Sequence, residues 1–282
     1  MAQFTRALEI LELLGDSSRW CVEIGASTGG STSPTMPLVD AGYDALWIER
    51  DDDKFASLVH DYTDRKNVCL CHAAVTPENI CTLLASAGAP QAPGMLSLDI
   101  DGVDYHVLNR ILGGVPEKFG MLSIDTGGYD YYTLNSLLGG YRPLLIHAEV
   151  NEKIPPPVKF TIKNKPEYRW LFGHLYGMSI ALLNDLAEKY DYGYEGMYDQ
   201  DIVLIDKRRA PEEFKFVEYP GVYDIYRRSE LARSSTSYNH NVEHWLDIDN
   251  TYELVDSINE FYADYRDDYN LWLGEGEPQC TK

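Results

Sequence analysis

Two aspartates one residue apart, Asp99 and Asp101, have the spacing that most directly suggests chemistry. They occur in Leu98-Asp-Ile-Asp-Gly102, where a short apolar run ends. Carboxylates in such a pair can ligate a hard cation, hold a substrate amine or accept a proton. The structural alternative is that Asp99 caps the following turn while Asp101 faces water. Open α/β sheets bind their ligands at the carboxyl ends of the strands, so this position is also compatible with a chemical role.

Other polar residues also follow apolar runs. Glu149 ends one such run and Asp125 ends another, so these two would complete an oxygen-rich site for a divalent metal ion with Asp99 and Asp101. His106, at the start of a predicted helix, is the preferred proton acceptor. His147 lies within an apolar run, which favours a hydrogen-bonded core histidine over a base.

A loop of small residues follows the first apolar run, within Trp20 to Gly30. Gly25, Ser27 and Gly29 alternate in it, and small residues let a backbone turn sharply and pass close to a ligand. A second apolar run ends at Glu49, about twenty residues further on. This pattern predicts a nucleoside site in which loop amides face the ligand and Glu49 binds both ribose hydroxyls. A strand-loop-helix turn without a ligand is the alternative. Ser27 has no partner for triad chemistry.

The motif Glu23-x-Gly25-x-Ser27-x-Gly29 resembles the S-adenosylmethionine loop of class I methyltransferases, and in particular an FkbM-like branch of that superfamily. The resemblance extends over residues 18 to 206, through Val22–Ala26, Leu46–Glu49, Leu96–Gly102 with Asp104 and Tyr105, and Tyr141–Pro143. It implies a Rossmann-like fold, S-adenosyl-L-methionine as cofactor and methyl transfer as the reaction. The cofactor-binding residues that it implies are Glu23, Gly25, Ala26, Ser27, Gly29, Glu49, Arg50, Ala74 and Asp99. Catalysis would fall to Asp99, Asp101 and His106.

The centre of the chain contains a tandem repeat. Residues 95–114 and 121–140 align without gaps and are identical at twelve of twenty positions, with Gly127 in the second copy where the first has Asp101. We interpret them as a duplicated strand-loop-helix unit. Because right-handed crossovers place successive parallel strands side by side, the second copy should add strand 121–125 beside strand 95–99 and give an eight-stranded sheet. Asp99 and Asp125 would then lie roughly 5 Å apart. A surface hairpin or a swapped dimer element is the alternative.

The elements that must position these residues alternate between strand and helix patterns. This alternation predicts an α/β fold with a mainly parallel sheet and helices on its faces. Residues 192–196 and 201–206 are expected to form a terminal antiparallel hairpin. We therefore expect a cofactor-binding domain over residues 1–210 and an acidic, aromatic-rich helical appendage over 211–282. The appendage is open to interpretation as a lid or as a homodimer contact.

Composition limits the partners. The net charge of −21 argues against nucleic acid and anionic membranes, which would repel the chain. No apolar run is long enough to span a bilayer and the N-terminus has no signal-peptide core, so the cytoplasm is the expected location. Cys21 and the Cys69/Cys71 pair lie in apolar runs, which predicts buried thiols, with a Cys-x-Cys zinc site as the weaker alternative.

The predicted function is methyl transfer to a small molecule. An acidic, tyrosine-rich cleft would favour a polar or cationic acceptor. Two alternatives remain open at this point. One is metal-assisted chemistry other than methyl transfer in the same cofactor pocket, and the other is a non-catalytic assembly scaffold.

Overall fold

The computed structural model describes residues 2–15, 18–100, 104–114, 118–165, 173–228, 242–276 and 278. The strands of its main sheet are β1 (Trp20–Ile24), β2 (Asp44–Glu49), β3 (Val68–His72), β4 (Met95–Leu98), β5 (Lys118–Ile124), β6 (Arg142–Glu149), β8 (Tyr192–Tyr198) and β9 (Asp201–Asp206). The α-helices are α1 (Ala2–Leu13), α2 (Met36–Asp40), α3 (Asp52–Tyr62), α4 (Ile80–Ser86), α5 (Asp104–Leu112), α6 (Asp130–Leu138), α7 (Ile180–Tyr190), α8 (Gly221–Arg227) and α10 (Thr251–Phe261).

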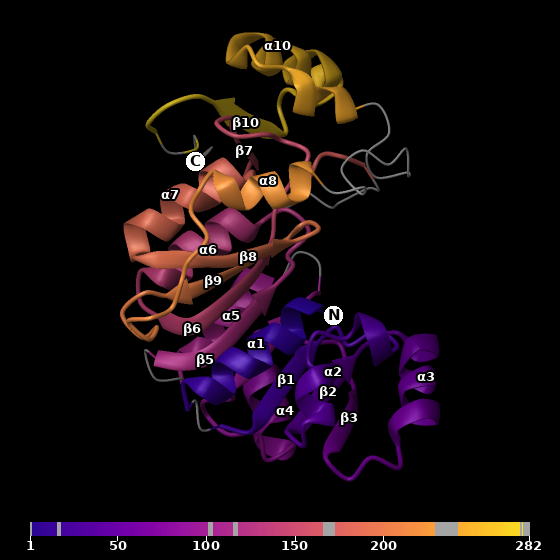
Figure 1. Ribbon diagram of the computed structural model, residues 1–282. Coiled ribbons are helices and arrows are strands. Elements are labelled where there is room, and N and C mark those ends of the chain that lie inside the picture. The colour runs from indigo at the N-terminus through magenta and orange to yellow at the C-terminus, as the bar shows by residue number, and fades with distance from the viewer. Residues whose placement is uncertain are drawn as a thin grey trace. The chain divides into compact units, whose positions relative to one another are not determined.

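The main sheet has eight strands in the order β3-β2-β1-β4-β5-β6-β9-β8. Figure 1 shows β1, β2 and β3 side by side. The pairs β2/β3, β1/β2, β1/β4 and β4/β5 are parallel, and β8 and β9 form an antiparallel hairpin. Helices follow most strands, as the alternating sequence pattern predicts. The predicted α/β fold with a mainly parallel sheet and a terminal antiparallel hairpin is therefore confirmed.

The tandem repeat adds one strand to this sheet. β5 pairs with β4 in the register of the repeat itself, so that Met95, Leu96 and Ser97 lie opposite Met121, Leu122 and Ser123. The prediction of an inserted neighbouring strand is confirmed, although β5 begins three residues earlier than the repeat, at Lys118.

The chain divides into two compact units, and the first comprises residues 1–126, 137–147 and 209–212. Its strands β1, β2 and β4 are almost fully buried, whereas β3 is an edge strand that, among the described residues, pairs only with β2. The prediction of buried thiols is confirmed for Cys21 but wrong for the other pair, since Cys69 is exposed and Cys71 half-buried. An edge strand leaves part of its surface to solvent even where its sequence is apolar.

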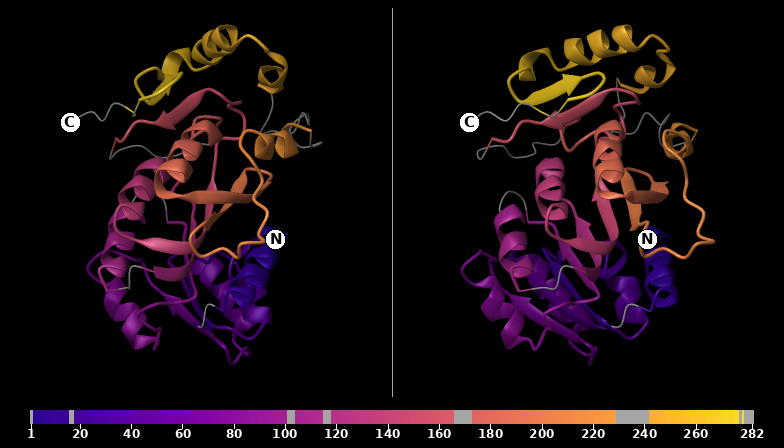
Figure 2. Two further views of the ribbon diagram at one scale, coloured as in Figure 1. Left: turned by 60° about the vertical axis from the view of Figure 1, so that its left-hand side comes forward. Right: turned by 90° about the vertical axis from the view of Figure 1, so that its left-hand side faces the viewer.

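The second unit comprises residues 127–136, 148–208 and 213–282. Besides helices, the C-terminal segment contains a strand, β10 (Tyr269–Trp272), which pairs antiparallel with β7 (Lys159–Ile162). Figure 2 shows β10 beside β7 in both views. Trp245, Leu254 and Ile258 pack with Phe160 and Ile162 of β7 in one apolar cluster. The C-terminal segment therefore contains the predicted helices together with one strand, and the predicted domain boundary at residue 210 stays a prediction.

No helix in the described part of the chain has both the length and the hydropathy that a membrane span requires.

Candidate cofactor site

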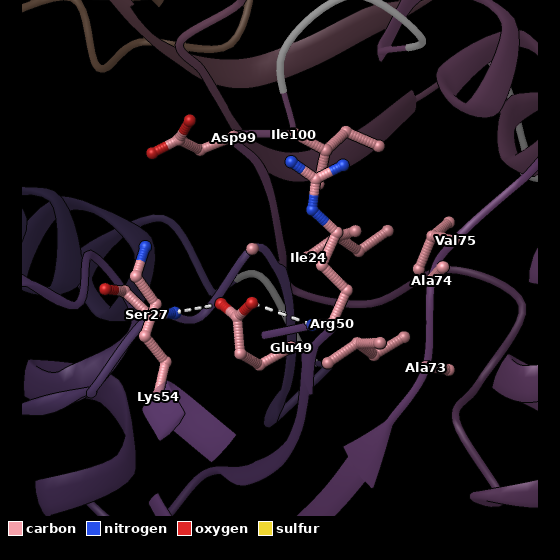
Figure 3. Close-up of a pocket in the computed structure, with 12 residues that line it drawn as sticks. Ile24, Ser27, Glu49, Arg50, Lys54, Ala73, Ala74, Val75, Asp99 and Ile100 are labelled. Carbon is pink, nitrogen blue, oxygen red and sulfur yellow. Dashed lines mark hydrogen bonds between the residues drawn. The ribbon is translucent and has the colours of Figure 1, made fainter. Parts of the chain in front are cut away.

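A pocket of about 190 Å³ lies where β1, β2 and β4 end (Figure 3). All of its lining residues belong to the first unit. Six of them were predicted from the sequence, namely Gly25, Ser27, Glu49, Arg50, Ala74 and Asp99. The sequence analysis missed Ile24, Ile48, Lys54, Ala73, Val75 and Ile100, most of which adjoin a predicted residue along the chain.

Glu49 lies at the centre of this pocket, 6% exposed. Its Oε2 accepts a hydrogen bond from the Ser27 N–H at 2.7 Å, and its Oε1 accepts from the N–H groups of Arg50 at 2.7 Å and Asp51 at 2.8 Å. Figure 3 shows the carboxylate between Ser27 and the backbone of Arg50. The carboxylate therefore fixes the small-residue loop onto the end of β2.

The amides of this loop do not all face the pocket. Gly25 and Ala26 both donate to the Ile48 carbonyl, at 2.9 and 3.1 Å, and the Ser27 N–H is occupied by Glu49. The expectation that loop amides face a ligand is wrong for these three residues, because their hydrogen bonds join the loop to β2.

Gly25 permits a close contact between neighbouring strand ends. It has φ +87°, and a Cβ placed on it would lie 1.9 Å from the Asp99 carbonyl oxygen. A side chain there would separate the loop from the end of β4, where Asp99 lines the pocket. The glycine is therefore required by the approach of two backbones.

Glu23 is buried away from the pocket lining. Its Oε2 accepts hydrogen bonds from the hydroxyls of Ser33 at 2.6 Å and Thr35 at 2.5 Å, and the Trp47 Nε1–H donates to Thr35 Oγ1 at 2.8 Å. Burial raises the pKa of Glu23 to about 7, and the two hydroxyl donors act against this rise. Its position indicates that Glu23 anchors the segment after the loop, which the sequence motif did not reveal. Ala26 and Gly29, also predicted as cofactor-binding residues, are likewise buried and outside the pocket lining.

The buried Glu23 should make folding stability depend on pH. Its folded pKa of about 7 exceeds the ordinary 4.5, so the folded chain binds this proton more tightly than the unfolded chain does. The contribution of Glu23 to the free energy of unfolding is therefore greatest below pH 4.5 and is lost as the pH rises to about 7. The full loss is about 3 kcal/mol. Chemical denaturation across this pH range should show a free energy of unfolding that declines in the wild type but not in Glu23→Gln. The same pH dependence in both proteins would contradict this prediction.

The remaining predicted site residues lie outside the pocket lining or outside the described part of the chain. Asp101 lies outside the described residues. His106 is exposed on α5 and Asp125 follows β5, and neither belongs to the pocket lining. Glu149 accepts a hydrogen bond from Gln200 at 2.7 Å. His147 is a buried core residue whose Nδ1 lies 3.0 Å from Ser123 Oγ, as predicted.

The predicted metal site is not supported by the part of the chain that the structure describes. There, no group of three or more histidine, cysteine, aspartate or glutamate residues is arranged to hold a metal ion. This covers Asp99, Asp125, Glu149 and the Cys69/Cys71 pair, but not Asp101.

The main sheet contains the strand order β3-β2-β1-β4-β5-β6 of a Rossmann-like α/β fold, and the pocket lies where β1, β2 and β4 end. No family model matches the chain, and no curated protein matches its sequence.

Solved structures that resemble it include the N-terminal domain of EvdMO1 with SAH bound, at 16% identity, TM-score 0.36, and coverage of 72% of this chain and 79% of that one. A second is the glycopeptide N-methyltransferase MtfA complexed with S-adenosyl-L-methionine, at 11% identity, TM-score 0.36, and coverage of 71% and 92%. A third is the methyltransferase domain of bacterial CtHen1, at 11% identity, TM-score 0.32, and coverage of 72% and 97%.

Proposed function

We propose that the chain binds S-adenosyl-L-methionine in the pocket of Figure 3 and transfers its methyl group to a small polar or cationic molecule. The observation that carries this proposal is the position of Glu49. Its buried carboxylate ends β2, contacts the Gly25–Ser27 loop and lines a pocket with Ala73, Ala74 and Val75. We also propose that the chain belongs to the FkbM-like branch of this superfamily, and this part of the proposal is supported by the sequence motifs alone.

The pocket lining contains acidic and apolar groups that suit different parts of the proposed cofactor. A carboxylate has about four acceptor sites, and three of those on Glu49 are filled by backbone N–H groups. One site on Oε2 remains for a ribose hydroxyl, one fewer than the sequence analysis expected. The small apolar residues Ala73, Ala74 and Val75 would contact the adenine, and Asp99 would attract the cationic amino-acid part.

The cofactor would supply an electrophilic methyl group. The chain then has to align the acceptor and, for a hydroxyl or a protonated amine, remove a proton. Asp99 lines the pocket and is our candidate for that proton transfer. His106 and Asp101 remain proposals from sequence for the same step.

Replacing Glu49 tests the proposal. A hydrogen bond to a charged group contributes about 1.5–3 kcal/mol, so Glu49→Ala should weaken S-adenosylmethionine binding at least about tenfold in isothermal titration. Glu49→Gln retains the shape but turns an amide toward a backbone N–H donor, so it should also weaken binding. Asp53→Asn, an exposed change on α3, is the matched control and should bind as the wild type does.

The outcomes separate the competing functions. Unchanged affinity in Glu49→Ala would reject the assignment of the site. Binding by the wild type only when Mg²⁺ is added would favour metal-assisted chemistry. Absence of binding by the wild type with or without Mg²⁺ would favour the assembly scaffold.

A further inference from the structure

The first unit contains a second hollow, of about 360 Å³, which the proposed function does not use. It lies among β1, β4, α4, α5 and the connection from α4 to β4. None of its lining residues is shared with the pocket of Figure 3. The residues that line it are Val22, Cys81, Leu84, Ala85, Ala89, Pro90, Gln91, Pro93, Leu96, Arg110, Ile111 and Gly114.

The inner end of this hollow is apolar. Val22 and Leu96 are directly opposite each other in the β1/β4 ladder, and both are 1% exposed. Leu84 of α4 and Ile111 of α5 add aliphatic surface, and the two helices contact each other. Small residues at Ala85, Ala89 and Gly114 leave the space between these side chains open. A volume in the range of about 300–1,000 Å³ with mainly apolar walls is typical of small-molecule sites.

The polar side chains of the hollow are few and include a single cation, Arg110, on the last turn of α5. Within the described ranges the Arg110 guanidinium has no ion pair and no hydrogen bond. This is notable in a chain with 45 acidic and 24 basic residues. A planar guanidinium beside an apolar surface suits a carboxylate, which it can bind through two parallel hydrogen bonds.

We propose that this hollow binds a small amphiphilic carboxylate. Its hydrocarbon part would lie against Val22, Leu96 and Ile111, and its carboxylate on Arg110. Octanoate has the required combination of a short apolar chain and one negative charge. This inference does not depend on the proposed function, because the two pockets share no lining residue.

Cysteine alkylation provides a direct test. Cys81 lines the hollow and is exposed, whereas Cys69 is exposed on β3 and lies outside it. Iodoacetamide labelling of the native full chain, mapped by mass spectrometry, measures the two thiols in one sample. Octanoate below its micellar concentration should slow alkylation of Cys81 at least about fivefold and leave Cys69 unchanged.

Two comparisons isolate the charge and the volume. Octanol has the same chain length and no charge, so the concentration that protects Cys81 equally should be about tenfold higher than for octanoate. Arg110→Met should abolish this difference between the two ligands. Ala85→Phe should fill the hollow and make Cys81 labelling insensitive to octanoate. Thermal melting verifies that both surface variants fold. An unchanged Cys81 rate, equal slowing of Cys81 and Cys69, or equal protection by octanol would each overturn the proposal.

Discussion

A Gly25→Ala variant is expected to lose both the proposed S-adenosylmethionine binding and a large part of the folding stability. A Cβ at this position would lie 1.9 Å from the Asp99 carbonyl oxygen, so the loop and the end of β4 would have to separate. The left-handed φ of +87° costs an alanine about 1–2 kcal/mol, and the overlap adds about 1–3 kcal/mol. Urea denaturation should therefore show a loss of about 2–5 kcal/mol.

The matched control is Gly88→Ala. Gly88 has φ +73°, but no atom lies within 4 Å of the position that a Cβ would take. This variant should show only the backbone cost of about 1–2 kcal/mol and should bind S-adenosylmethionine as the wild type does. Equal losses in the two variants would mean that the contact with Asp99 does not matter.

Lys153→Met is the second change with a large expected effect, in the second unit. Lys153 and Glu152 are both buried, with Lys153 Nζ 2.5 Å from Glu152 Oε1 and 2.8 Å from the Tyr176 hydroxyl. Tyr176 in turn donates to Glu152 Oε2. Burial and the Glu152 carboxylate raise the pKa of Tyr176, which keeps this donor protonated. Removing the ammonium leaves a buried carboxylate without its counter-ion, which should cost about 3–5 kcal/mol.

Lys159→Met serves as the comparison, because Lys159 also contacts a carboxylate at 2.5 Å, that of Asp185. Here the Asp185 side chain is 39% exposed, so water can replace the ammonium and the loss should be about 1 kcal/mol or less. The double variant Glu152→Gln/Lys153→Met should recover part of the loss seen with Lys153→Met, since no charge then remains buried. Denaturation curves that rank Lys159→Met as equally harmful would contradict this account.

Most of the sheet could be predicted because its signals are local. Apolar runs with strand length, and the alternation of strand and helix patterns, each depend on neighbours in sequence. The inserted strand could also be predicted, since the repeat itself shows that a whole unit was copied and handedness rules then place the copy beside the original.

The errors arise where distant segments decide the outcome. The sequence of β3 does not reveal that it is an edge strand, so Cys69 was expected to be buried. β10 is short and forms its ladder with β7, more than a hundred residues earlier. The motif that contains Glu23 indicated a ligand contact, but Ser33 and Thr35 satisfy that carboxylate instead. These relations depend on the assembled fold, which local patterns do not encode.

The in-register repeat also affects how the chain reaches this fold. Because β4 and β5 both contain Met-Leu-Ser and align in register, we expect β5 to compete with β4 for pairing with β1 during folding. A chain with two nearly equivalent pairings has a competing compact state, and such competition slows folding and favours exchange of segments between copies. The two repeat copies differ, for example in Ile100 against Thr126 and in the extension of β5 to Lys118, and we expect these differences to select the native strand order. We therefore expect substitutions in either copy to change the fraction of chains that fold to the native strand order more than they change the stability of the folded state.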